Sequence, residues 1–167
     1  MHLALRPRPA TDAMTYRSFF FCAFLLLVPI FGCAPEGDVM RDGYYSARAD
    51  SFDEDGWQEF LTLYIHNNKI VTVEYNARNI CGLIMSWDAL HLSRLKSTLG
   101  VHPNQIVREY MNELLHRQTP QGIRRAKRDT RFYDSFKALA LVAMEQAKAG
   151  DKTVIELPVD RTGTKAK

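Results

Sequence analysis

The sequence predicts an α+β fold, in which a small antiparallel sheet with a hairpin carries three helices and a last strand ends the domain. Three observations predict it. Two alternating apolar segments flank an Asn-Asn pair, three segments of helical apolar period follow one another, and one β-branched segment comes last. Because the strands and helices form separate runs and do not alternate, an all-parallel sheet is disfavoured.

The predicted strands take their boundaries from residue type. Residues 43–49 are rich in aromatic and small side chains and form the first strand. Residues 60–65 and 70–75 alternate around Asn67-Asn68, which predicts two strands joined by a tight hairpin. Residues 153–157, Thr-Val-Ile-Glu-Leu, form the last strand.

The predicted helices follow apolar stripes and stop signals. The first spans 87–99 and ends before Gly100, with one apolar side formed by Trp87, Leu90, Leu95 and Leu99. The second opens at Pro103, which suits a first helical turn. Its apolar stripe consists of Ile106, Val107, Tyr110, Met111, Leu114 and Leu115. The third spans about 132–149 and ends before Gly150, with an inner side formed by Phe132, Phe136, Leu139, Ala140, Ala143 and Ala147.

The N-terminal segment has the organisation of an export signal. A basic residue, Arg17, precedes the apolar residues 19–31, and this run is shorter than the roughly 20 residues of a spanning helix. Ile30-Phe31-Gly32-Cys33 resembles a lipobox, where a bacterial signal peptidase cuts before a cysteine that becomes diacylated. We therefore expect lipid attachment at Cys33 and an extracytoplasmic protein on a bacterial cell membrane. A plain membrane anchor and an apolar core segment are the alternatives.

The domain organisation follows from this signal. Residues 1–32 are the expected signal peptide, with Met14 as a more ordinary start. Residues 33–41 form a lipidated tether, 42–159 the folded domain and 160–167 a disordered tail. After cleavage, Cys81 is the remaining unmodified cysteine, so no intramolecular disulfide and no CxxC metal pair are expected. The formal net charge of +3 is too small to define a basic face.

Two groups of polar residues suggest metal binding and are better explained without it. An acidic loop that ends at Gly56 contains Asp50, Asp53, Glu54 and Asp55. It lacks the ligand spacing of a calcium loop, so a solvated loop is the favoured interpretation. Four histidines outside the signal segment lie on different elements without zinc spacing: His66, His91, His102 and His116. We predict no metal site.

The stretch from Arg124 to Thr130 is a candidate anion site. It precedes the third helix, whose free N–H groups and positive dipole end favour a phosphate. Thr130 lies where a capping hydroxyl is expected. The surrounding cations are Arg124, Arg125, Lys127, Arg128 and Arg131. A phosphorylated ligand is therefore predicted, and a solvated basic loop is the alternative.

Six stretches connect the domain to a known family: 42–45 (Asp-Gly-Tyr-Tyr), 74–79 (Glu-Tyr-Asn-Ala-Arg-Asn), 86–88 (Ser-Trp-Asp), 114–120 (Leu-Leu-His-Arg-Gln-Thr-Pro), 133–140 (Tyr-Asp-Ser-Phe-Lys-Ala-Leu-Ala) and 147–153 (Ala-Lys-Ala-Gly-Asp-Lys-Thr). In their order and spacing, residues 42–159 resemble the FMN-binding domain of bacterial membrane-anchored lipoproteins. These are relatives of the flavin-carrying subunits of Rnf-type and sodium-pumping quinone-reductase complexes. The resemblance implies FMN as cofactor and electron transfer as function.

The chain departs from the family at its cofactor motif, Asp-Ala-(Val or Leu)-(Ser or Thr)-Gly-Ala-(Thr or Ser). The stretch Arg124–Thr130 has the same length, but only Thr130 matches. The resemblance implies covalent attachment of FMN through Thr130, whereas the glycine and the aspartate of the motif are absent from this stretch. One choice of codons for 124–129, read one base later, restores most of the motif, so a compensated frameshift is a hypothesis that resequencing tests.

The resemblance also suggests residues for cofactor binding. These are Arg128, Asp129, Thr130, Tyr133 and Ser135. Trp87 and Tyr45 are candidates for neighbours of the flavin ring, although aromatic residues at such places are more often part of the core.

Two functions from different classes remain open at this point. The first is a lipid-anchored electron carrier, without catalytic residues of its own, that exchanges electrons with a redox partner protein. The second is a non-redox surface lipoprotein or antigen that keeps the scaffold and has lost FMN. Binding of nucleic acid through 124–128 is disfavoured, because the protein is exported and the run has no interleaved aromatic residues.

Overall fold

The computed structural model describes residues 39–159, which lie within the compact unit Gly37–Lys167. Its elements in chain order are β1 (Gly43–Ala49), β2 (Trp57–His66), β3 (Lys69–Asn79), the 3₁₀ turn η1 (Met85–Trp87), α1 (Ala89–Leu99), α2 (Pro103–Arg117), α3 (Tyr133–Ala149) and β4 (Ile155–Leu157). The predicted α+β class is confirmed. The expected signal peptide 1–32, the lipid site Cys33 and the tail 160–167 lie outside the described residues.

The tether and the domain meet earlier than expected. Met40, which we placed in the tether 33–41, is buried, and its N–H donates to Asn68 Oδ1 at 2.8 Å. The N–H of Arg41 donates to the carbonyl of Ala147 at 2.8 Å. Residues 40 and 41 are therefore held by the folded domain.

The predicted hairpin is confirmed. Asn67 and Asn68 have φ values of 51° and 59°, which a tight two-residue turn between antiparallel strands requires. β2 and β3 pair around them, with Leu63 opposite Val73. Both strands are longer than predicted. In β2 the inward positions continue through Glu59, a buried carboxylate that interrupts the apolar pattern on which the prediction depended.

The sheet is mixed, whereas the sequence predicted an antiparallel one. Its order is β3-β2-β1-β4, and β4 runs parallel to β1, with Ala47 opposite Ile155. The reason lies in α3, whose last turn reaches the start of β1 through the Arg41–Ala147 hydrogen bond. The chain then reverses at Gly150 (φ 73°) and follows β1 in the same direction.

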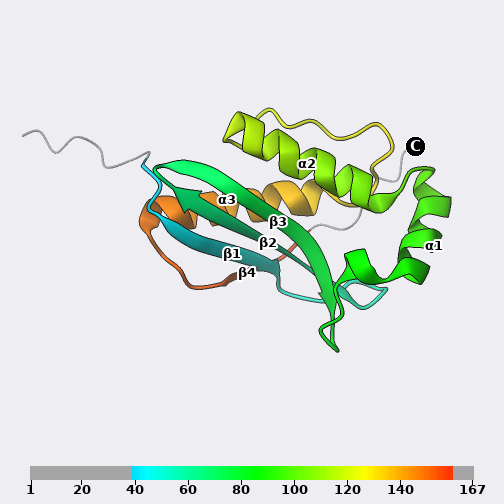
Figure 1. The fold of residues 1–167 in the computed structure, drawn as a ribbon. Helices are drawn as coiled ribbons and strands as arrows, with labels where there is room; N and C mark the ends of the chain where they lie inside the picture. Colours follow the sequence, from blue (N-terminus) through cyan, green and yellow to red (C-terminus); the bar gives the residue numbers. More distant parts are fainter. Residues whose placement is uncertain (1–38, 160–167) are drawn as a thin grey trace, which may run out of the picture. The chain divides into compact units, whose positions relative to one another are not determined.

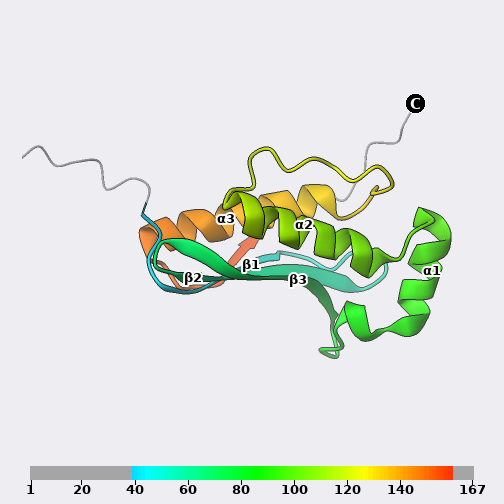
Figure 2. The same ribbon diagram turned by 45° about the horizontal axis from the view of Figure 1, so that its top comes forward.

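The helices α2 and α3 cover one face of the sheet (Figures 1 and 2). The core between these layers contains Tyr45, Leu61, Leu63, Leu114, Phe136 and Leu139, all with almost no exposed surface. Each such side chain contributes roughly 1.5–3 kcal/mol through its removal from water. The opposite face of the sheet is not covered by any helix of the described residues (Figure 2).

The outer edge of β3 is closed by side chains of α2 and of the residue after it. The side chain of Gln118 accepts from Ile70 N–H at 2.7 Å and donates to the Ile70 carbonyl at 3.0 Å. The N–H of Tyr75 points to the sulfur of Met111 at 3.4 Å. These contacts occupy backbone groups that would otherwise invite another strand.

The first predicted helix needs correction. The chain forms η1 and then α1, which starts after Asp88, whose carboxylate caps the N–H of His91 at 2.9 Å. Trp87 and Leu90, predicted on the inner side, are 76% and 64% exposed. The buried residues of α1 are Leu92 and Leu99, because α1 packs beside α2 and η1 and not across the sheet. None of the helices described in 39–159 is long and apolar enough to cross a membrane.

Candidate functional site

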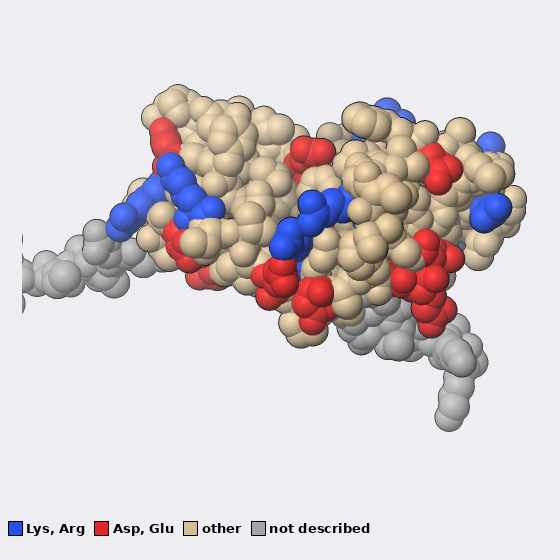
Figure 3. Space-filling view, turned by 90° about the horizontal axis from the view of Figure 1, so that it is seen from below, with Lys and Arg blue, Asp and Glu red and all other residues tan. Residues whose placement is uncertain are grey.

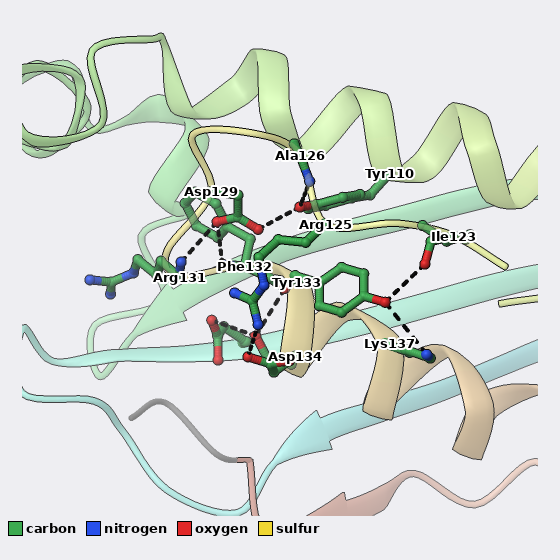
Figure 4. Close-up of polar contacts among 12 residues, drawn as sticks. Tyr110, Ile123, Arg125, Ala126, Asp129, Arg131, Phe132, Tyr133, Asp134 and Lys137 are labelled. Atoms are coloured by element: carbon green, nitrogen blue, oxygen red, sulfur yellow. Dashed lines mark hydrogen bonds and ion pairs between the residues drawn. The ribbon is translucent and has the colours of Figure 1, made fainter. Parts of the chain in front are cut away.

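The candidate site is the turn before α3, and a buried carboxylate organises it (Figure 4). Asp129 is 3% exposed. Its Oδ1 accepts from the N–H groups of Arg131 and Phe132, each at 2.8 Å. Its Oδ2 accepts from the Tyr110 hydroxyl at 2.6 Å, and that hydroxyl in turn accepts from Ala126 N–H at 2.9 Å. Asp129 therefore binds the turn to the start of α3 and to α2 at once.

The predicted cap of α3 is not formed, because the N-cap residue is Phe132 and no side chain caps it. We expected the hydroxyl of Thr130 to cap the helix, but Thr130 is exposed. The carboxylate of Asp129, one residue earlier, binds the N–H groups before the first turn. A carboxylate suits this position better than a hydroxyl, because it can accept several hydrogen bonds. Its negative charge also interacts favourably with the positive end of the helix dipole.

Three cations around the turn have partners within the protein. Arg125 pairs with Asp134 and lies over the Tyr133 ring, 4.8 Å from its centroid. Arg128 donates to the carbonyl of Gly100 at 2.8 Å, which ties the turn to the end of α1. The pairing with Asp134 raises the pKa of Arg125. The basic stretch is therefore largely a set of internal contacts.

Arg131, the third of these cations, explains the acidic loop. Its guanidinium pairs with Asp53 and, at 3.2 Å, with Asp55. Asp53 also accepts from Trp57 N–H at 2.7 Å. The loop and the turn before α3 thus neutralise one another, a pairing that the sequence analysis missed. Across residues 39–159, no group of three or more His, Cys, Asp or Glu side chains is placed to hold a metal ion.

The remaining predicted cofactor residues point in different directions. The hydroxyl of Tyr133 donates to the Ile123 carbonyl at 2.9 Å, so it closes the turn from the helix side. Ser135 is fully buried and faces the sheet, where its hydroxyl lies 2.9 Å from that of Tyr75. Arg128, Asp129 and Thr130 share one turn, but Ser135 does not open onto it.

Ser135 belongs to a buried polar cluster that we did not predict. It donates to Glu59 Oε1 at 3.0 Å, and Tyr75 donates to the same oxygen at 3.4 Å. Burial, the first cause, and the Glu59 charge raise the pKa of Tyr75 well above its usual value. The signal was present in the sequence, because Glu59 continues the inward alternation of Leu61 and Leu63.

The two aromatic candidates for flavin contact lie in different environments. Tyr45 is a fully buried core residue, and its hydroxyl has no hydrogen-bond partner among the described residues. Trp87 is mostly exposed on η1. Neither position by itself argues for a ring site.

As folded, the turn before α3 does not fit an FMN phosphate. The Asp129 carboxylate already occupies the N–H groups of Arg131 and Phe132. A phosphate bound at these N–H groups would have to approach the buried Asp129 carboxylate, and two anions at short range repel one another. No glycine lies between Gly122 and Gly150 to let a phosphate approach the backbone.

Comparisons with known proteins show one named relative. The chain is 29% identical over 114 residues to a Treponema pallidum (strain Nichols) protein named "15 kDa lipoprotein". The match covers 68% of this chain and 81% of that protein. No protein-family model matches the chain.

Two solved structures are similar in shape. A crystal structure of a Clostridium perfringens protein superposes with a TM-score of 0.68 at 20% identity, over 73% of this chain and all of that one. A solution structure of a Clostridium thermocellum protein gives a TM-score of 0.42 at 23% identity, over 69% and 95% of the two chains. The first similarity identifies the fold and nothing further.

Proposed function

We propose that this protein is an exported bacterial lipoprotein, anchored through a lipid on Cys33, that acts through its protein surface and not through a bound flavin. The lipobox-like residues 30–33 support the anchor, and so does the relative named a lipoprotein. The domain keeps a scaffold that resembles FMN-binding lipoproteins. It contributes a folded surface at the membrane.

The observation that carries the proposal is the position of Asp129. A carboxylate that accepts from the two N–H groups just before α3 and from Tyr110 lies in the turn to which the family resemblance assigns a phosphate. Loss of FMN binding then has a physical cause, because a ligand phosphate would have to displace a buried, hydrogen-bonded carboxylate. Arg125 and Arg131 are likewise engaged with Asp134 and Asp53.

Flavin loading tests the proposal directly. Residues 33–167 carrying Cys33→Ser are produced in cells that supply FMN and a flavin-transferring enzyme, and the purified protein is examined by visible absorbance and intact mass. We expect a colourless protein whose mass is that of the bare chain. Flavin absorbance that survives gel filtration would contradict the proposal, and so would a mass increase equal to an FMN ester.

Matched variants show whether Asp129 is the obstacle. Asp129→Gly removes the carboxylate from the turn and provides backbone freedom, whereas Asp134→Gly removes a more exposed carboxylate from the first turn of α3. If the carboxylate blocks the site, weak flavin retention appears in the first variant and not in the second. Equal retention in both variants would show that the Asp129 carboxylate is not the obstacle to flavin binding.

Electron transfer with FMN is the second candidate function. The exposure of Thr130 favours it, because an esterified hydroxyl has to be accessible to the modifying enzyme. A redox partner protein would then exchange electrons with the cofactor. The mass measurement separates this candidate from the first, since the ester would be found on the peptide that contains Thr130.

A further inference from the structure

The face of the sheet opposite α2 and α3 contains a groove. Its volume is about 400 Å³, and its lining includes Arg48, Phe60, Thr62, Arg78, Ile84 and Val154. Small-molecule sites typically measure roughly 300–1,000 Å³ and are mostly apolar with a few placed polar groups. Figure 3 looks onto this face, where acidic and basic side chains form a few groups on an otherwise uncharged surface.

Phe60 provides the apolar floor of the groove, because strand alternation turns it away from the buried neighbours Glu59 and Leu61. Phe60, half-buried on β2, has Arg48 of β1 opposite it on one side and Asn76 of β3 on the other. One wall is the segment after β3, which folds back so that Ile84 pairs with Arg78. The other wall contains Val154, just before β4, which is 54% exposed.

Arg78 gives the groove a fixed positive charge. Its Nε and Nη2 donate to Gln58 Oε1 at 3.3 and 3.2 Å. Gln58 is itself 6% exposed and donates to the Ala49 carbonyl at 2.8 Å, so the arginine is held by a buried amide. Within residues 39–159, no carboxylate forms an ion pair with Arg78.

Arg48, the second arginine of the groove, has N–H donors that its protein partner does not use. The Nε and Nη2 of Arg48 both bind one oxygen of Glu156, which leaves Nη1 without a protein partner among the described residues. A guanidinium that is positioned by a neutral amide keeps its attraction for an anion and pays less ordering entropy when one binds. Arg78 is therefore the stronger of the two candidates for contact with a ligand.

We propose that this groove binds a small organic anion, whose apolar body lies on Phe60 and whose carboxylate or phosphate pairs with the guanidinium of Arg78. The complementarity of charge and the apolar floor together define the ligand class. The site lies on the sheet face opposite the helices and does not depend on the turn before α3. Anion binding in this groove is therefore independent of whether the turn before α3 binds FMN.

Two fluorescent probes of the same shape test this proposal. Anilinonaphthalene sulfonate is a flat apolar anion, and phenylnaphthylamine is an uncharged analogue. Both are titrated into residues 33–167 with Cys33→Ser, and into the same chain with Arg78→Gln or Arg108→Gln. Arg108 is an exposed arginine on α2, in the opposite layer, and serves as the matched control.

We expect one saturable site for the anionic probe, and Arg78→Gln should weaken its binding about tenfold, the effect of one charge-assisted hydrogen bond. The uncharged probe should bind Arg78→Gln and the unchanged chain equally. Octanoate should displace the anionic probe, whereas inorganic phosphate alone should not. An unchanged affinity in Arg78→Gln overturns the proposal, and so does an equal loss in Arg108→Gln or displacement by phosphate without octanoate.

Discussion

At the residue scale, Asp129 decides the character of the candidate site. Capping side chains are worth about 1 kcal/mol, and a buried hydroxyl left without its partner costs about 1–3 kcal/mol. Asp129 accepts from two N–H groups ahead of α3, in the manner of a capping side chain, and it is also the partner of the Tyr110 hydroxyl. Asp129, one of the residues that depart from the expected cofactor motif, is thus also a structural residue of this fold.

Asp129→Ala is expected to lower the free energy of unfolding by about 3 kcal/mol, because the hydrogen bonds from Arg131 and Phe132 N–H and the Tyr110 partner are lost together. Urea denaturation followed by circular dichroism measures the change. The exposed Asp134→Ala is the control, and it should cost less than about 1 kcal/mol, as surface ion pairs do. Similar losses in the two variants would mean that the Asp129 contacts contribute little.

Two buried tyrosines predict a loss of stability in alkali. Burial is the first cause that raises the pKa of both Tyr75 and Tyr110, with Glu59 adding to the first and the Asp129 hydrogen bond to the second. Above about pH 10 the unfolded chain loses these protons while the folded chain keeps them, so unfolding becomes more favourable as the pH rises. The stability is fully present below that pH.

The urea midpoint of unfolding, measured at pH 8 and at pH 11, checks this loss. These pH values lie about 2 units below and about 1 unit above the usual tyrosine pKa. Tyr110→Phe should reduce the drop between them, since phenylalanine carries no proton to lose. The exposed tyrosine Tyr44, changed to Phe, is the matched control. A drop that Tyr110→Phe leaves unchanged would assign the alkaline loss to other groups.

At the element scale, α1 is the part that sequence periodicity described least well. An apolar stripe that included Trp87 and Leu90 suggested a helix lying on the sheet, yet both side chains are mostly exposed. The capping residue Asp88 was a visible start signal that sets the helix one turn later. Periodicity assumes a single covered face, and α1 lies beside α2 at the end of the sheet, where little covers it (Figure 1).

Asp88→Ala is expected to loosen α1 locally, by about 1 kcal/mol, because the N–H of His91 loses its cap. Hydrogen exchange of the α1 amides should become faster while the amides of β2 and α3 keep their protection. Ser93→Ala, an exposed change within α1, is the control. Uniform acceleration through the whole domain would show instead that α1 unfolds only with the core.

At the scale of the whole molecule, the proposed anchor precedes a domain with its own core. Cys33→Ser should move most of the protein from the detergent phase and membrane fraction to the aqueous fraction, because the diacyl chains contribute most of the membrane affinity. Cys81→Ser, on the exposed segment after β3, is the matched control and should stay with the membrane. Membrane retention of Cys33→Ser would favour an uncleaved apolar anchor over the lipoprotein.

The sequence by itself determined the element types, the hairpin at Asn67-Asn68, the helices that begin near Pro103 and Phe132, and the class of the fold. These depend on local chemistry, namely turn residues, caps and apolar period. Only the tertiary structure decided that β4 runs parallel to β1, that Arg131 pairs with the acidic loop, and that Asp129 fills the turn before α3. Each of these joins residues far apart in the chain or depends on which side chain is buried, and burial is settled by packing between layers.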